Sequence, residues 1–202
     1  MSDFKYKNVT VSGLPGAGST TLGKSLAQKT GWKYFSGGDF MRAYAIREGL
    51  FDENNNLHHD ATVYGEEFDR QIDFEVRRTA ESEEGNVMDA WLSGFMTIGV
   101  EGTLRVLAMC SDDAVRVDRI VNRDNVSVVD AKKHIFLREE KNLTKWSKMY
   151  AKEWGEWVVK TGLMPKGEAI DFWNPNLYDL VIDTFSSPKD ESLRMVMDKL
   201  VG

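Results

Sequence analysis

The sequence contains few of the residues that cross-link or stiffen a chain. Among its 202 residues are one cysteine, Cys110, and four prolines. A single thiol excludes an intramolecular disulfide and fits a reducing compartment. The apolar residues just before it, 106–109, predict a buried thiol at a strand end rather than a nucleophile. A chain of this length can instead be stabilised by one substantial hydrophobic core.

Long apolar runs are absent as well. No window approaches the roughly 20 apolar residues that a membrane-spanning helix needs. Residues 1–7 lack the apolar centre of a secretion signal. Hydrophobic residues make up 42% and charged residues 29% of the chain, which is typical of a soluble globular domain. We therefore expect a cytoplasmic protein that does not bind membranes.

Histidine and excess positive charge are scarce too. Two of the three histidines, His58 and His59, are adjacent in the polar stretch Asp52–Asp60 and lack ligand-spaced partners, which predicts a surface loop rather than a zinc site. The net charge of −6 argues against binding of a nucleic-acid polymer. The segment from Arg116 to Lys148, however, holds nine basic and five acidic residues. A local positive segment of this kind suits a small polyanion.

The most informative motif lies between Asn8 and Gln28. A short strand candidate, Val9–Val11, leads into a glycine-rich stretch, and a helical pattern follows. This order is typical of a phosphate-binding loop, because glycines let main-chain N–H groups approach an anion and the helix N-terminus adds the positive end of its dipole. The hydroxyl of Thr20 stands where the G-x-x-x-x-G-K-[ST] motif places its magnesium ligand. The predicted loop consists of Gly13, Leu14, Pro15, Gly16, Ala17, Gly18, Ser19, Thr20 and Thr21.

One position of this motif differs from the pattern. Ser19 stands where the motif has lysine, so the backbone cage is kept but the cation that reaches the β- and γ-phosphates is missing. Either another group supplies that charge, or the site binds without catalysing. A lid can carry guanidinium groups to the transferring phosphoryl group while it excludes water. The candidate cations are Arg116, Arg119 and Arg123 on one helix, then Arg138 and Lys145 on the next.

The apolar pattern along the chain predicts strands that alternate with helices. This order indicates one three-layer α/β domain over residues 1–202, with a parallel sheet whose ligands bind at the carboxyl ends of the strands. Insertions at about 40–85 and 116–165 are candidates for mobile lids. Aromatic residues between Trp146 and Val158 predict packing on a long helix from Ala131 to about Lys160. The predicted strands are Val9–Val11, Trp32–Phe35, Val87–Leu92, Leu104–Cys110 and Tyr178–Asp183.

Several motifs, taken together and in order, resemble the archaeal-type cytidylate kinase family. Gly16–Thr21 is similar to that family's Gly-Ser-Gly-Thr-Thr-Thr loop, which also has a hydroxyl residue in place of lysine. The other similar stretches are Ser36–Arg42, the lid region Val115–Arg123 with Arg138–Glu140, and the last strand, Tyr178–Thr184. Together they run from the first strand to the last helix.

The resemblance implies a P-loop kinase fold with a five-stranded parallel sheet of order 2-3-1-4-5, an acceptor-binding insert and a helical lid. It also implies ATP with Mg²⁺ as the donor. The loop would hold the ATP phosphates, and Thr20 the magnesium ion. Arg119 would lie against adenine, while Arg123, Arg138 and Lys145 would act on the phosphates. The residues expected to place the acceptor are Ser36, Asp39, Arg42, Asp73 and Asp89.

The sequence also departs from this family. An arginine expected to contact the acceptor phosphate is Trp91 here, a later lid arginine is Lys145, and the segment 150–176 is longer. Lysine keeps the charge but loses the fork geometry of arginine. Candidate replacements for the missing contact are Arg77, Arg78 and Arg105.

These observations predict an ATP-dependent nucleoside monophosphate kinase that transfers the γ-phosphoryl group to CMP or dCMP, as a monomer or homodimer. Two alternatives remain open. Trp91 is compatible with a P-loop kinase for another small acceptor. Ser19 and Trp91 together are compatible with a regulatory module that binds nucleotide without turnover.

Overall fold

The computed structural model describes residues 4–47, 49 and 64–202. The predicted loop Asp52–Asp60, with its two histidines, lies outside the described residues. Five strands form one sheet, and every pairing in it is parallel. The strand order is β2-β3-β1-β4-β5, which confirms the predicted order and fold class. The strands are β1 (Asn8–Gly13), β2 (Lys33–Ser36), β3 (Asn86–Asp89), β4 (Thr103–Met109) and β5 (Leu180–Asp183).

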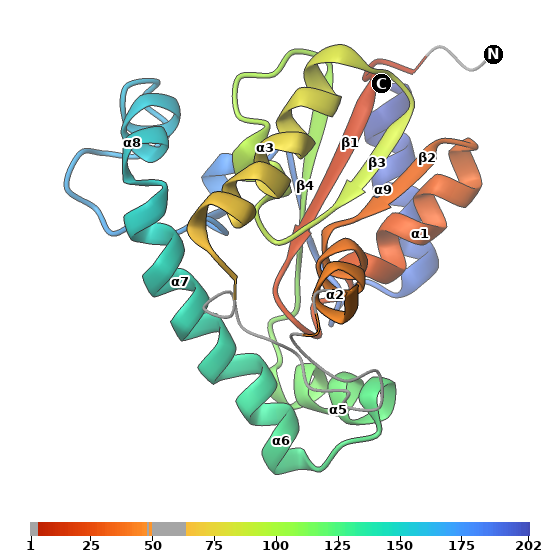
Figure 1. The fold of residues 1–202 in the computed structure, drawn as a ribbon. Helices are drawn as coiled ribbons and strands as arrows, with labels where there is room; N and C mark the ends of the chain where they lie inside the picture. The colour runs from red at the N-terminus through yellow and green to blue at the C-terminus, as the bar shows by residue number, and fades with distance from the viewer. Residues whose placement is uncertain (1–3, 48, 50–63) are drawn as a thin grey trace.

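Helices cover both faces of the sheet (Figure 1). On one face, α1 (Ser19–Thr30) and α9 (Lys189–Val201) pack over a core formed with β1, β3 and β4. On the other, α3 (Glu66–Ser82) and the short α4 (Ser93–Met96) contact each other and the sheet. Because both faces are covered, every residue of the central strand β1 is buried, including the polar Asn8, Thr10 and Ser12. Cys110 is buried directly after β4, as predicted.

The third strand is shorter than its apolar pattern predicts. The pattern continues to Leu92, but β3 ends at Asp89 because the chain turns there into α4. This turn leaves Asp89 at the carboxyl end of β3, beside the end of β1, with which it pairs at Val11. Helix α2 (Gly37–Arg47) likewise begins directly after β2, and Ser36 Oγ accepts a hydrogen bond from the Asp39 N–H at 3.2 Å.

The predicted long helix is a series of helical pieces. It begins earlier than Ala131, because the Ser127 hydroxyl caps α6 (Val128–Lys132) by accepting from the Asp130 N–H at 3.1 Å. A π-helical turn, Lys133–Leu137, joins it to α7 (Arg138–Met149). The chain then continues through α8 (Ala151–Trp154) and a second π-helical turn, Gly155–Val159. Figure 1 shows α5 (Asp113–Asp124) and α6 beyond the carboxyl edge of the sheet, with α7 running back along its side.

Two separate cores hold this helical segment. At one end, Val117 and Ile120 of α5 form a small cluster with Ala131 of α6 and Ile135 of the first π-helical turn. From Trp146 onward, the predicted aromatic stripe packs into the main core against Phe95 and Phe172, which confirms its packing role. The far half of the predicted lid is therefore anchored to the body of the protein. None of the helices in the described residues combines the length and the apolar character needed to cross a membrane.

Candidate active site

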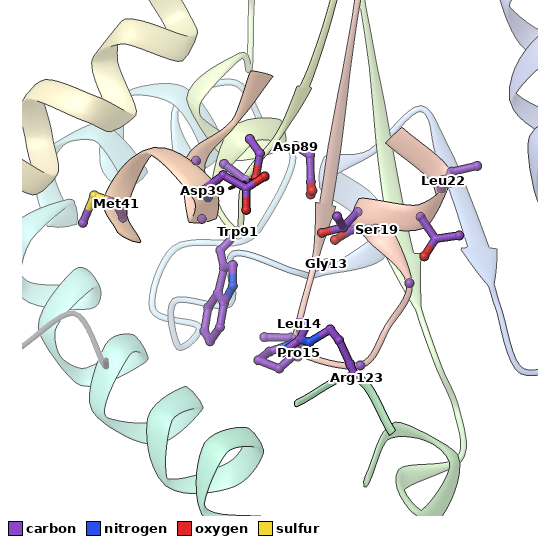
Figure 2. A pocket seen from close by; sticks show the side chains of 18 of the residues that line it. Gly13, Leu14, Pro15, Ser19, Leu22, Asp39, Met41, Asp89, Trp91 and Arg123 are labelled. Atoms are coloured by element: carbon purple, nitrogen blue, oxygen red, sulfur yellow. Dashed lines mark hydrogen bonds between the residues drawn. The ribbon is translucent and has the colours of Figure 1, made fainter. Parts of the chain in front are cut away.

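A cleft of about 1050 Å³ lies at the carboxyl edge of the sheet. It is lined by the glycine-rich loop, by the start of α2 and by residues of α3, α5 and α7. Figure 2 shows Ser19 and Asp89 pointing into this space, into which the ring of Trp91 also extends. The cleft therefore joins the predicted phosphate loop to the predicted acceptor residues.

The conformation of the loop is fixed by hydrogen bonds from outside it. The Nε of Arg116 donates to the Pro15 carbonyl at 3.1 Å, and Nη1 of Arg119 donates to the Gly16 carbonyl at 3.0 Å. The Thr184 hydroxyl, just after β5, donates to the Ala17 carbonyl at 2.7 Å. Three successive carbonyls are thus bound by side chains, as buried polar groups must be. Sequence reasoning placed Arg116 among the phosphate cations, whereas its Nε holds the loop.

The glycines and the helix end complete an anion site. Gly16 has φ +79, and a Cβ atom there would lie 2.7 Å from the Arg116 carbonyl oxygen, so a side chain is excluded. Helix α1 begins after Gly18, and no side chain caps its first amides. Uncapped N–H groups at the positive end of a helix dipole bind phosphate groups. This local geometry fits the phosphates of a nucleotide.

The side chains of Thr20 and Asp89 meet beside this loop. Asp89 is buried and accepts a hydrogen bond from the Tyr34 hydroxyl at 3.0 Å. Burial raises the pKa of Asp89, and the nearby hydroxyls of Thr20, Tyr34 and Ser19 counteract part of that rise. A hydroxyl and a carboxylate are the hard oxygen ligands that Mg²⁺ takes together with water and substrate phosphates. Across the part of the chain that the structure describes, no cluster of three or more His, Cys, Asp or Glu side chains could hold a metal by itself.

Three of the predicted arginines line the cleft. Arg119 is bound closely to the protein: besides Gly16, it donates to the Thr184 hydroxyl at 2.8 Å and the Thr184 carbonyl at 2.9 Å. Arg123 is paired with Asp124 at 2.8 Å and is half exposed. The Arg138 guanidinium lies 4.8 Å from the centroid of the Trp91 ring. The structure thus brings these cations to the cleft, and their roles stay predictions.

Lys145 is placed differently from the arginines. Its ammonium group donates to Asp69 Oδ2 and to the Tyr64 carbonyl, both at 2.8 Å, and its side chain is only 11% exposed. It therefore links α7 to α3 at the acceptor end of the cleft. Its predicted action on the phosphates stays a prediction.

All five residues predicted to place the acceptor line the cleft: Ser36, Asp39, Arg42, Asp73 and Asp89. Trp91 lines it too, where a family arginine was expected. The suggestion that Arg77, Arg78 or Arg105 replaces that arginine is wrong for this arrangement. Arg77 donates to the Met96 carbonyl at 2.8 Å, Arg78 pairs with Glu75, and Arg105 pairs with Asp179 at 2.9 Å. None of the three is among the residues that line the cleft.

Sequence reasoning did not single out Asp69, although this side chain is 4% exposed and lines the cleft. The signal was its spacing: Asp69 precedes Asp73 by four residues, which places both on one face of a helix.

Comparison with known proteins identifies relatives of this arrangement. The model of the cytidylate kinase-like family matches residues 8–186. A cytidylate kinase from Archaeoglobus fulgidus is 30% identical over 189 residues, covering 94% of this chain and 92% of the relative. A cytidylate kinase from Methanopyrus kandleri is 27% identical, covering 96% of this chain and 94% of the relative.

Solved structures share the fold at low sequence identity. An uncharacterized protein from Eubacterium ventriosum superposes with a TM-score of 0.61 at 14% identity, covering 96% of this chain and 98% of the other. A gluconokinase from Sinorhizobium meliloti superposes with a TM-score of 0.51 at 13% identity, covering 97% and 92%. At these identities the likeness concerns the fold alone.

Proposed function

This chain belongs to the cytidylate kinase-like family, and we propose that it is an ATP-dependent nucleoside monophosphate kinase whose acceptor is CMP or dCMP. The observation that supports this most is the composition of the cleft. It holds an uncapped phosphate loop, Thr20 beside Asp89, four arginines and an acidic acceptor end. Each part corresponds to one requirement of phosphoryl transfer.

At the donor end, the loop amides would bind the phosphates of ATP. Thr20 and Asp89 would hold a magnesium ion, which neutralises negative charge on phosphate oxygens when it is bound. Arg116, Arg119 and Thr184 keep the loop in its conformation, so that little reorganisation is needed when the phosphates arrive.

At the acceptor end, Ser36, Asp39 and Arg42 would place the acceptor nucleotide. Transfer of the γ-phosphoryl group requires its donor and acceptor oxygens to be in line, which is a matter of positioning. Arg123 and Arg138 would stabilise the equatorial oxygens of the transferring group. A phosphate acceptor is already ionised at neutral pH, so we assign no general base.

A second candidate is a P-loop kinase for another small acceptor. The observation that favours it is Trp91, which gives the acceptor end an aromatic wall in place of a fork-shaped cation. The two proposals differ only in the acceptor, because both need the same donor site.

The test is a coupled assay of ADP production with ATP, Mg²⁺ and a panel of nucleoside monophosphates, including deoxyribose forms. Selective turnover of CMP or dCMP supports the first proposal. Turnover of a different acceptor alone supports the second. ATP binding by calorimetry without turnover of any acceptor contradicts both, and would leave the nucleotide-binding module as the remaining alternative.

A further inference from the structure

The ring of Trp91 lies between the cleft and two other indole rings. Trp91 follows β3 by two residues, and its ring extends into the cleft (Figure 2). Its centroid is 5.5 Å from that of Trp146, with an interplanar angle of 80°, and 6.0 Å from that of Trp173, with an angle of 70°. Edge-to-face pairs at these distances stabilise a structure beyond the area that they bury. Trp146 and Trp173 therefore hold the Trp91 ring in the wall of the cleft.

Trp173 also binds the main chain at Trp91. Its indole Nε1 donates to the Trp91 carbonyl at 3.0 Å, although the two residues are 82 positions apart. Trp173 is half-buried in the segment 150–176, next to Phe172, which is fully buried in the main core. The N–H of Trp173 donates to Asp171 Oδ1 at 3.0 Å, which closes a short turn. Trp173 thus connects the main core to the position of Trp91.

Arg138 lies over the ring that these contacts hold. Its guanidinium carbon is 4.8 Å from the centroid of the Trp91 ring, and the residue lines the cleft. The negative face of an indole ring attracts a guanidinium group, more strongly where water is excluded. A guanidinium group contacts a ring through its flat face, while its N–H donors point outwards in its own plane. The Trp91 ring can therefore hold Arg138 in one position while Arg138 donates to oxygen atoms in the cleft.

We propose that Trp173 is a positioning residue for phosphoryl transfer, because through Trp91 it places the guanidinium group of Arg138 for the transferring group. Trp173 is not among the described residues that line the cleft, so its effect must pass through Trp91. A cation that is already in place needs little reorganisation when charge develops in the transition state. This gives the segment 150–176 a function in the reaction. The inference rests on the proposed function, in which Arg138 acts on the transferring phosphoryl group.

A double-mutant cycle tests the connection between Trp173 and Arg138. Trp173→Phe keeps an aromatic ring but removes the N–H group that donates to the Trp91 carbonyl. We expect this variant to lower kcat at least about tenfold, because small displacements of a catalytic group have large effects on the rate. The KM for ATP should stay unchanged, since the phosphate loop is not altered. In an Arg138→Ala background, the same substitution should lower kcat by less than about twofold, because the group that Trp173 positions is gone.

The matched control is Trp157→Phe. Trp157 is also half-buried in the main core, 5.5 Å from Phe95, but the cation over its ring is Arg77, which is not among the described residues of the cleft. This variant should keep the wild-type kcat. An unchanged kcat in Trp173→Phe would overturn the inference. Equal losses from Trp173→Phe in the wild-type and Arg138→Ala backgrounds would overturn it too, because Trp173 would then act on the rate by another route.

NMR spectroscopy of the protein without nucleotides tests the arrangement independently of turnover. Protons over the face of an aromatic ring resonate upfield. The δ-methylene signal of Arg138, assigned with Arg138→Lys, should therefore lie upfield in the wild-type protein and move downfield in Trp91→Leu. Trp173→Phe should move it in the same direction, and Trp157→Phe should leave it in place. A signal that moves in neither Trp91→Leu nor Trp173→Phe, or in Trp91→Leu alone, would contradict the inference.

The outcomes separate this inference from the function on which it rests. If the wild-type protein turns over no acceptor, the proposed function fails, and the Arg138 signal still decides whether Trp173 positions this residue. If an acceptor is turned over and the cycle is additive, the kinase assignment stands and the role of Trp173 is overturned. Where Trp173→Phe does not give the wild-type circular dichroism spectrum, Asp171→Ala takes its place in both experiments, because it loosens the turn that carries Trp173 from an exposed position.

Discussion

Asp73 should make the protein less stable as the pH rises, and Asp73→Asn should remove this effect. Burial raises the pKa of Asp73 from its ordinary value of 3.8 to about 7, with a smaller contribution from the negative charge of Asp69. The Tyr150 hydroxyl, Lys145 and Arg70 act in the opposite direction without outweighing burial. The carboxyl group therefore keeps a proton in the folded protein at a pH where the unfolded chain has released it.

The size of the effect follows from the two pKa values. Between pH 3.8 and about 7 the folded state binds more protons than the unfolded state, so the free energy of unfolding falls as the pH rises. The values are roughly three pH units apart, and each unit corresponds to about 1.4 kcal/mol. The total is about 4 kcal/mol, fully developed above pH 7. Asparagine does not ionise and still offers an oxygen to the Tyr150 hydroxyl.

The assay is urea unfolding followed by tryptophan fluorescence at several pH values between 5 and 8. We expect Asp73→Asn to gain stability relative to wild type as the pH rises, with the largest difference at pH 8. Glu75→Gln, on the same helix but exposed, should show no such trend. A difference between Asp73→Asn and wild type that is the same at pH 5 and pH 8 would refute the reasoning, because it would mean that Asp73 has an ordinary pKa in the folded protein.

Five other substitutions test the phosphate loop and the residues around Arg138. Arg138→Ala should lower kcat on the order of a hundredfold with little change in ATP affinity, and an unchanged rate would remove this residue from the mechanism. Ser19→Lys should give no gain in kcat, because arginines already line the cleft; a large gain would show that the native loop lacks charge. Gly16→Ala, at φ +79 and facing the Arg116 carbonyl, should weaken ATP binding at least about tenfold by calorimetry. Trp91→Leu should lower kcat more than Trp91→Phe, which keeps a ring beneath Arg138; equal rates would contradict a cation–π role.

The sequence was sufficient for the parts of the site that depend on local geometry. The loop and its helix follow from glycine spacing around Gly16 and Gly18, and both are found where predicted. The sheet order came from the family resemblance and is confirmed. Strand periodicity placed Asp89 at a strand end, although β3 is shorter than predicted because the chain turns early into α4.

Residues that depend on distant partners could not be predicted in this way. Asp69 was not singled out because nothing near it in sequence shows that Lys145, 76 residues later, contacts it. Arg77 was considered for the acceptor phosphate because the sequence does not show which groups bind it. The Met96 and Ile98 carbonyls that bind it become its neighbours only in the fold. Burial on a helix face depends on the element packed against it, and periodicity alone does not identify that element.

The arrangement of arginines indicates how the site can work without the lysine of its loop. Arg116 and Arg119 donate to the carbonyls of Pro15 and Gly16, so their main contribution is to hold the loop amides in place for phosphate. Arg116 also donates to Glu139, next to Arg138, which ties the loop to the start of α7. A conformational change at the loop can therefore reach α7, which carries Arg138, through the buried guanidinium of Arg116. In the proposed function, charge neutralisation falls to Arg123 and Arg138, which line the cleft. In this proposal, one pair of arginines holds the loop and the other pair neutralises the charge of the transition state. A P-loop lysine serves both purposes together.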